Sequence, residues 1–256
     1  MNNKLKINAP IYWLTVETAQ DRHVHMVGQF FLYGIDSHTL VRGYSSDNIW
    51  ALTPNTQYPH IIDNRSLAII LSHLNIIKKF YYETTSEMAL IFEDDISFEL
   101  SNYWNFSLNE VIRQLPRGWN VIQLCLIRNE NLTDVRFRFM RDSDWSVAAY
   151  LISRSYAKRL IDQYVRGTNL YHIDTVTSYY NLTPCIEAVL FCLDFANHYT
   201  FPILTENLDI PSTFYSNGLI ENTHKSLNYK SGMEIVNWWR TNGSTKDLSY
   251  FFQQFK

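Results

Sequence analysis

Short apolar runs that suit buried strands alternate along this chain with longer segments whose apolar residues recur at helical spacing. The strand-like runs comprise residues 39–41, 88–92, 120–127 and 148–153, and a further one precedes the first helix-like segment. Chains with this alternation pack helices on the faces of a sheet whose strands are mainly parallel. The chain is therefore expected to be an α/β sandwich with a mainly parallel central sheet.

Two of the expected helices have clear start signals. Apolar residues at positions 67, 70, 71, 74 and 77 predict a helix, and Asp63, Asn64 or Ser66 is available as its cap. Ser107 and Glu110 have the spacing of a capping box ahead of a second apolar stripe. These segments indicate helices between successive strands.

The chain has 256 residues, of which 46% are hydrophobic and 18% charged, so it can bury a core and disorder is excluded. No window approaches the ~20 unbroken apolar residues of a transmembrane helix. The net charge is −3, which argues against a basic surface for nucleic acid. With no linker and no internal repeat, a single domain is the simplest arrangement.

The N-terminus and the cysteines indicate the compartment. The first ten residues lack the apolar core of a secretory signal. The three cysteines are odd in number and lack the spacing of a metal site, which favours reduced thiols over a disulfide framework. A cytoplasmic location is therefore expected.

The most unusual motif follows the run of residues 88–92, where Glu93, Asp94 and Asp95 stand in a row before apolar residues resume. Ligands of α/β sheets bind beyond the carboxyl ends of the strands. Because side chains alternate along an extended chain, Glu93 and Asp95 would project to one side and could share one cation. Carboxylate oxygens suit Mg²⁺ or Mn²⁺, which often joins carboxylates to substrate phosphates. The alternative is a solvated acidic turn, although adjacent carboxylates repel one another without a nearby cation.

Several familiar catalytic motifs are absent from the sequence. It contains neither the G-x-x-x-x-G-K-[ST] loop of P-loop nucleotidases nor the G-x-G-x-x-G fingerprint of dinucleotide-binding proteins. The nucleophile elbow G-x-S-x-G is also missing. These absences disfavour the corresponding three classes of enzyme.

Four stretches occur between residues 11 and 165 in a characteristic order: IYWLTVETAQDRHVHM, LAIILSHLNIIKKF, ALIFEDDISF and AAYLISRSYAKRL. This order resembles glycosyltransferase family 25, which includes lipooligosaccharide and procollagen galactosyltransferases. Further on, TPCIEAVLF and YTFPILTENLDIPST look like the family's later acidic turn and its Pro and Ser-Thr segment. The acidic turn has Glu187 where many members have Asp.

The resemblance implies a GT-A fold, which is a Rossmann-like sandwich, and a UDP-sugar donor with a divalent cation, usually Mn²⁺. It implies transfer of a hexose or N-acetylhexosamine to a hydroxyl group, with inversion at the anomeric carbon. The single domain 1–256 would then consist of a nucleotide-sugar-binding half, about residues 1–130, and an acceptor-side half with the C-terminal segment, about residues 131–256.

The resemblance also implies roles for particular residues. Asp95 would be the direct metal ligand, and Glu93 or Asp94 would support the metal-bound water or the ribose. Further residues are implied at the nucleotide-sugar site: Thr15, Glu17, Arg22, Ser72 and His73. For Arg22 the alternative is a surface arginine on a helix.

The general base and a third metal ligand are also expected to come from this chain. Glu187 is the first choice for the base because it opens a predicted helix, and Asp174 and Asp144 are second choices. In many GT-A enzymes a histidine from the C-terminal region completes the metal site. His224 is preferred here over His198, which directly precedes a strand-like run.

Two other functions stay open. A catalytically weak or inactive relative would act as a nucleotide- or glycan-binding module, and a metal-dependent phosphoesterase would also need clustered carboxylates. The expected partners are a UDP-sugar donor and a glycan or glycoprotein acceptor. No nucleic-acid partner and no transmembrane segment are expected, and the oligomeric state is left open between a monomer and a homodimer.

Overall fold

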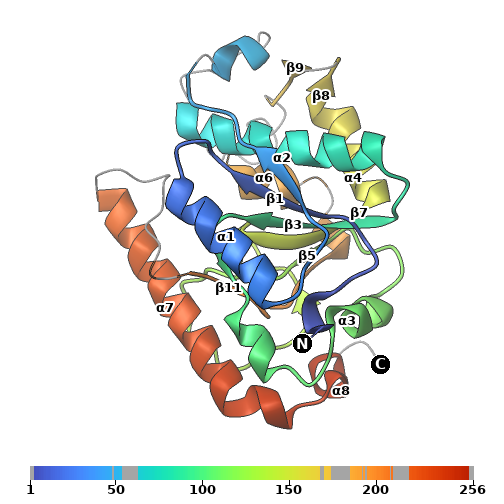
Figure 1. Cartoon of the computed structure of the whole chain (residues 1–256), viewed down its shortest axis with the longest axis vertical. Coiled ribbons are helices and arrows are strands. Elements are labelled where there is room, and N and C mark those ends of the chain that lie inside the picture. Colours follow the sequence, from blue (N-terminus) through green and yellow to red (C-terminus); the bar gives the residue numbers. More distant parts are fainter. Residues whose placement is uncertain are drawn as a thin grey trace.

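The computed structural model describes residues 3–47, 49–53, 63–167, 170–173, 185–191, 193, 195–207, 209 and 219–253. Within them, seven strands form one central sheet in the order β2-β1-β3-β7-β5-β10-β6 (Figure 1). Their bounds along the chain are β1 (Ile11–Thr15), β2 (Thr39–Arg42), β3 (Met88–Glu93), β5 (Val121–Gln123), β6 (Arg138–Phe139), β7 (Ala149–Ser153) and β10 (His198–Thr200).

The strand directions confirm the predicted α/β fold with a mainly parallel sheet. β1 is parallel to both β2 and β3, and β10 is parallel to β5. β7 lies antiparallel between β3 and β5, and β6 is antiparallel to β10 at the edge. The strands β1, β2, β3, β5 and β10 therefore end at the same edge of the sheet.

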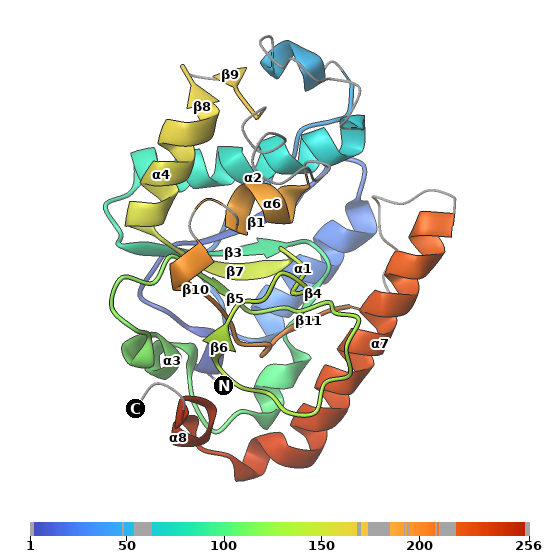
Figure 2. The ribbon, with the colours of Figure 1, turned by 180° about the vertical axis from the view of Figure 1, so that it is seen from behind.

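Helices cover both faces of the sheet (Figures 1 and 2). One face is covered by α2 (Asn64–Glu83), α4 (Arg154–Tyr164) and α6 (Ile186–Phe191), and the other by α1 (Gln20–Leu32), α3 (Leu108–Gln114) and α7 (Leu219–Asn242). Two separate hydrophobic clusters result, because side chains alternate along each strand. On β1, for example, Tyr12 and Leu14 pack with the α2 side, and Ile11 and Trp13 pack with the α1 side.

Both predicted helix starts are confirmed, and Asp63 is the cap of α2 among the three candidates. Asp63 caps α2, since its carboxylate Oδ1 accepts hydrogen bonds from the backbone N–H groups of Arg65 (2.9 Å) and Ser66 (3.0 Å). Ser107 and Glu110 form the expected capping box of α3. Caps of this kind satisfy backbone donors that have no partner within the helix.

Short elements complete the described chain. Their bounds are η1 (Asn3–Leu5), η2 (Ile49–Leu52), β4 (Ile96–Ser97), η3 (Glu99–Tyr103), β8 (Val165–Arg166), β9 (Leu170–Tyr171), η4 (Phe195–Asn197), β11 (Thr205–Glu206), η5 (Gly243–Thr245) and α8 (Leu248–Phe251). β4 pairs with β11 in an antiparallel two-stranded sheet. This pairing brings residues 205–206 beside the segment that follows the acidic motif.

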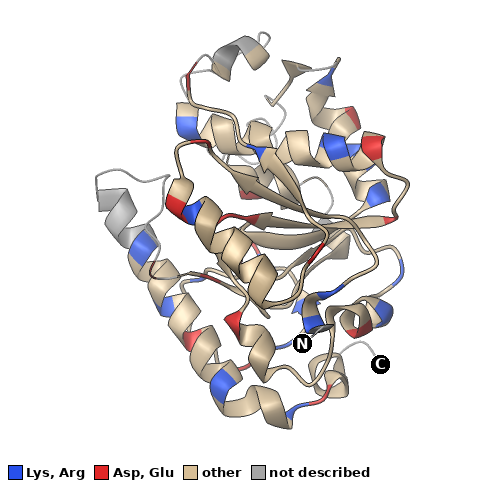
Figure 3. Ribbon diagram, in the orientation of Figure 1, with Lys and Arg blue, Asp and Glu red and all other residues tan. Residues whose placement is uncertain are grey.

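The described helices were compared for apolar length and for the distribution of charged residues. No helix among these residues is both long and apolar enough to cross a membrane. Figure 3 shows Lys and Arg interspersed with Asp and Glu along α2, α4 and α7. A cluster of carboxylates lies instead at the end of β3.

Candidate active site

The acidic motif closes β3 at the carboxyl end of the sheet. Glu93 is the last residue of β3, Asp94 and Asp95 form a turn, and β4 begins at Ile96. β1 lies parallel to β3, with Leu14 as the ladder partner of Glu93. The prediction that this motif sits at a strand end is therefore confirmed, and the end of β1 lies next to it.

Arg22 of α1 binds both aspartates of the acidic turn. It is 8% exposed, so the alternative of a surface arginine is wrong. Its Nη1 donates to Asp94 Oδ1 at 2.6 Å, and its Nη2 donates to Asp95 Oδ2. Burial alone would lower the pKa of Arg22, but the two carboxylates outweigh it and raise the pKa. The guanidinium therefore acts as a fixed counter-cation for the turn.

Burial and mutual repulsion favour the neutral forms of Glu93 and Asp94. The pKa of Asp94 is raised to about 6 by burial and by the charge of Asp95, although Arg22 and a hydrogen bond with Thr15 oppose the rise. Burial raises the pKa of Glu93 well above its ordinary value, and repulsion from Asp95 adds to it. Such stacked carboxylates lower their free energy by gaining a cation.

His73 of α2 supports Glu93 from the other face of the sheet. Its Nε2 lies 3.0 Å from Glu93 Oε1, and its Nδ1 lies 3.0 Å from the hydroxyl of Tyr150. The ring is fully buried, and burial lowers its pKa to about 4, so it is neutral near pH 7. The structure thus places His73 under the acidic motif, where it orients Glu93.

Ser72, its neighbour, anchors a loop. Its Oγ donates to the carbonyl of Ala68 (2.6 Å) and accepts the backbone N–H of Tyr44 (2.8 Å). This fixes the segment after β2 against α2. A cleft of about 460 Å³ opens here, and its walls include Leu14, Val16, Glu17, Thr18, Gly43, Tyr44, Ser45, Ser46, Asp47, Arg65, Ala68, Ile69 and Ser72. Glu17 and Ser72 therefore share one cleft, as a common role at the nucleotide would require.

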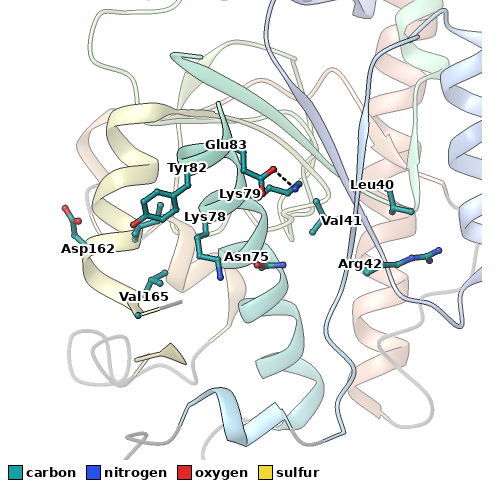
Figure 4. Close-up of a pocket in the computed structure, with 12 residues that line it drawn as sticks. Leu40, Val41, Arg42, Asn75, Lys78, Lys79, Tyr82, Glu83, Asp162 and Val165 are labelled. Atoms are coloured by element: carbon teal, nitrogen blue, oxygen red, sulfur yellow. Dashed lines mark hydrogen bonds and ion pairs between the residues drawn. The ribbon is translucent and has the colours of Figure 1, made fainter. Parts of the chain in front are cut away.

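A larger hollow, of about 1000 Å³, lies further along α2, towards its C-terminal end (Figure 4). It is bounded by β2, the C-terminal part of α2 and the end of α4, and Lys78, Tyr82 and Asp162 are among its walls (Figure 4). None of the site residues predicted from the sequence lines it. We therefore take the smaller cleft at the strand ends as the candidate site.

Glu187 and Glu206 meet at Ser146, in the loop that precedes β7. The Oε1 atom of Glu187 accepts the backbone N–H of Ser146 at 3.3 Å. The Oε1 atom of Glu206 accepts the Ser146 hydroxyl at 3.0 Å, and its Oε2 accepts the side-chain amide of Asn228 on α7 at 2.5 Å. Glu187 is close enough to Glu93 and His73 for its charge to raise the pKa values of both.

Glu206 is a site residue that the sequence did not reveal. Burial raises its pKa to about 8, and repulsion from Asp95 and Glu93 adds to the rise. Its strand, β11, has two residues, which is too short for a periodic signal. The signal that could have indicated it is a carboxylate inside the family-like segment YTFPILTENLDIPST.

The remaining predicted residues fall elsewhere or outside the description. Both carboxylate oxygens of Asp144 are bound by the guanidinium of Arg138, at 2.6 and 2.8 Å, so Asp144 braces its own loop. His198 is buried at the start of β10, opposite Val121, and thus at the amino end of the sheet. Asp174 and the side chain of His224 lie outside the described residues.

The oxygen donors of the turn fit a hard divalent cation that is held mainly by its substrate. Asp95 Oδ1 is a buried atom without a hydrogen-bond partner, while Oδ2 is anchored by Arg22. Within the described part of the chain, no three His, Cys, Asp or Glu side chains are already arranged around a metal position. Mg²⁺ and similar ions often use one or two carboxylates and take their other ligands from water and phosphate. The residues present are compatible with such a site.

Comparisons with known proteins give structural likenesses and no family. No protein-family model and no curated protein matches the chain. The chain is similar to the glycosyltransferase GlyE of Streptococcus pneumoniae TIGR4, with 11% identity and a TM-score of 0.39 over 93% of this chain. It spans 64% of the length of that GlyE chain.

Two further solved structures show similar values. The galactosyltransferase LgtC, solved with donor and acceptor sugar analogues, has 8% identity and a TM-score of 0.42, over 94% of this chain and 99% of LgtC. A glycosyltransferase involved in glycosylation of the major capsid of PBCV-1 has 8% identity and a TM-score of 0.36, over 76% of this chain and 82% of the other. At these values we draw no functional conclusion from the likenesses, and membership of family 25 stays a prediction.

Replacing Arg22 by methionine is expected to lower the free energy of unfolding by about 3–5 kcal/mol. The reason is that the buried carboxylates of Asp94 and Asp95 would lose their positively charged partner. The loss should shrink at lower pH, where Asp94 protonates. Urea denaturation at pH 5 and pH 8 measures both effects. Arg240→Met is the matched control, since Arg240 and Glu99 form an exposed pair (2.8 Å) and should contribute little. Equal stabilities for Arg22→Met and wild type would contradict the role of Arg22.

The metal-free protein is expected to lose stability as the pH rises. The folded-state pKa values of Asp94, about 6, and Glu206, about 8, exceed the ordinary values of 3.8 and 4.5, so the folded state holds these protons more strongly. Their contribution is complete below about pH 4 and is lost as the pH rises through 6 and then 8. Each pKa unit corresponds to about 1.4 kcal/mol, so a decline of a few kcal/mol is expected.

Urea denaturation in the presence of a chelator, from pH 4.5 to pH 9, tests this dependence. Glu206→Gln should remove the decline between about pH 6 and pH 8, where Asp94 is already ionised, and should leave the contribution of Asp94 below pH 6. A variant with the same pH profile as wild type would show that Glu206 does not carry a raised pKa.

Proposed function

We propose that this chain is a metal-dependent glycosyltransferase that moves a hexose or N-acetylhexosamine from a UDP-sugar to a hydroxyl group of a glycan or protein. One observation supports this most: Asp95 has a buried, unpartnered Oδ1 in the turn that follows β3. Leu14, the ladder partner of Glu93, lines the cleft that contains Glu17 and Ser72. A free carboxylate oxygen at the carboxyl edge of an α/β sheet suits a cation that carries a diphosphate.

The acidic turn would hold the diphosphate end of the donor. Asp95 and Glu93 are the proposed ligands of Mn²⁺ or Mg²⁺, with His224 as a third. When bound, the cation would supply charge neutralisation for the leaving diphosphate. Arg22 keeps Asp95 oriented through Oδ2, which leaves Oδ1 for the cation. His73 orients Glu93 in the same way from the other face.

The nucleoside end would lie in the cleft of about 460 Å³. Glu17 lines this cleft and supplies an acceptor for hydroxyl groups of the ribose. Ser72 fixes the wall through Tyr44. Asp94 is held in place by Arg22 and by a hydrogen bond with Thr15, the last residue of β1.

Glu187 is the proposed general base. Its carboxylate would accept the proton of the acceptor hydroxyl as the acceptor oxygen attacks the anomeric carbon. Attack from the side opposite the diphosphate inverts the configuration of that carbon. Glu187 comes from α6, whereas Glu93 ends β3 and Asp95 lies in the turn that follows it, so the base and the leaving group would approach the sugar from different elements.

Incubation with UDP-glucose, UDP-galactose and UDP-N-acetylglucosamine, with and without Mn²⁺, tests the proposal. We expect Mn²⁺-dependent release of UDP with one donor and thermal stabilisation by UDP plus Mn²⁺. Stabilisation without UDP release would identify a binding module. Release of inorganic phosphate from phosphate esters, without UDP release, would identify a phosphoesterase. Neither stabilisation nor release with any donor would overturn the proposal.

A further inference from the structure

Ser146 has a backbone conformation that serine rarely adopts. Its φ is 96°, and it is the non-glycine residue with a positive φ among the residues that the structure describes. L-residues in this region are strained by contacts of their Cβ atom. Such a conformation costs of order 1–3 kcal/mol and persists where surrounding contacts enforce it.

The contacts around Ser146 use every polar group that it has. The N–H donates to Glu187 Oε1 (3.3 Å), and the hydroxyl donates to Glu206 Oε1 (3.0 Å). The carbonyl accepts the side-chain amide of Gln123 (2.8 Å), and the hydroxyl oxygen accepts the N–H of Ala148 (3.2 Å). Ser146 is 5% exposed, so these bonds form away from competing water.

The two carboxylates that Ser146 binds come from distant elements. Glu187 belongs to α6 and Glu206 to β11. The charge of Glu187 acts on Glu93, and the charges of Asp95 and Glu93 act on Glu206. Glu206 also pairs with Ile96, the residue that follows the acidic turn. A single residue thus contacts two carboxylates that interact with the acidic turn.

The positive φ determines where the N–H of Ser146 points. Rotation about the N–Cα bond sets the direction of the N–H relative to Cβ, and therefore relative to the hydroxyl. At an ordinary negative φ, with the hydroxyl still on Glu206, the N–H would turn away from Glu187. The strained backbone is what allows one residue to reach both carboxylates.

We propose that Ser146 is a positioning residue, which fixes the orientation of the Glu187 carboxylate for proton transfer from the acceptor hydroxyl. The inference rests on the proposed function, because it assigns Ser146 to the base of that reaction. Ser146 acts through Glu187 and does not touch the substrate. Its backbone N–H orients Glu187, and its hydroxyl binds Glu206 of β11. Glu206 in turn accepts a hydrogen bond from Asn228 of α7.

Two substitutions separate the effect of the Ser146 backbone conformation from the effect of its hydroxyl group. Ser146→Ala removes the hydroxyl but keeps Cβ, while Ser146→Gly removes both and lets the backbone relax. We expect Ser146→Gly to have a melting temperature at least as high as that of Ser146→Ala. Its kcat should nevertheless be lower, by roughly 10- to 10²-fold relative to wild type, since small misplacements of reacting groups have effects of this size. The Kd for UDP with Mn²⁺ should stay within about twofold for both variants.

Activity and stability are thus expected to change in opposite directions between the two variants, which a merely structural role would not produce. Ser153→Ala serves as the control. Ser153 caps α4 through the N–H of Tyr156, so the variant should melt earlier while its kcat is unchanged. If kcat instead follows the melting temperature across all three variants, or if UDP binding falls with kcat, the inference is overturned.

A double-mutant cycle tests whether Ser146 acts through Glu187. In the background of Glu187→Gln, Ser146→Gly should lower kcat no further, because the base that it positions is already lost. If the kcat losses of the two single variants multiply in the double variant, Ser146 acts on another group and the inference is overturned. The wild-type assay separates this from the proposed function: absence of UDP release by wild type overturns the function, whereas unchanged kcat in Ser146→Gly overturns only the role of Ser146.

Discussion

Asp95→Asn is expected to reduce Mn²⁺-dependent UDP release by roughly 10³-fold, because a cation at the diphosphate supplies several kcal/mol and each 1.36 kcal/mol is a factor of ten. The amide keeps the shape of the carboxylate but lacks the charge that a cation needs. Oδ1 is the atom at stake, since it is buried and has no partner. UDP release and the thermal shift caused by UDP plus Mn²⁺ measure the two consequences, and both should be lost together.

A matched control for this variant is Asp134→Asn. Asp134 also pairs with an arginine, Arg136, at 2.7 Å, but this pair stands apart from the acidic turn in the chain. Its replacement should leave the dependence on Mn²⁺ unchanged. If Asp95→Asn still binds UDP with Mn²⁺ as wild type does, the acidic motif is only a structural turn and the proposed metal site is wrong.

The second large effect is expected at Glu187. Glu187→Gln should lower kcat by about 10²- to 10⁴-fold, a typical contribution of general acid–base catalysis. The side-chain carbonyl can still accept the N–H of Ser146, so the local geometry is preserved. The affinity for UDP with Mn²⁺ should stay close to that of wild type. Steady-state kinetics and calorimetric titration of UDP separate the two quantities.

Glu99→Gln provides the comparison, because Glu99 pairs with Arg240 on the surface and should not affect kcat. Loss of donor affinity equal to the loss of kcat in Glu187→Gln would assign Glu187 to donor binding. An unchanged kcat would assign the base to another carboxylate, and Asp174 would be the next variant to measure.

The parts of the fold that the sequence predicted are those with local causes. The helix α2 was predictable because its apolar stripe and its cap at Asp63 are neighbours in the chain. The acidic motif was predictable as a strand end because β3 is apolar up to Glu93. In both cases the relevant contacts lie within a few residues, so the pattern is visible without the fold.

The parts that were missed depend on contacts between distant residues. Arg22 was expected at the nucleotide-sugar site, but its pairing with Asp94, 72 positions away, was not, because nothing in a helix pattern shows that an arginine on it is buried. Glu206 comes beside the turn through the pairing of β11 with β4, and a two-residue strand leaves no periodic trace. The backbone of Ser146 gave no signal either, because positive φ is anticipated at glycine and asparagine and not at serine.

The guanidinium of Arg22 also bears on how the protein would behave when manganese is scarce. Because it neutralises part of the turn at all times, the acidic loop keeps its shape without any metal. If the proposed function holds, a cell with little manganese would retain folded but idle protein. Activity would then return as soon as the ion became available again, with no synthesis of new protein. The supply of manganese would set the rate of glycosylation without changing the abundance of the enzyme.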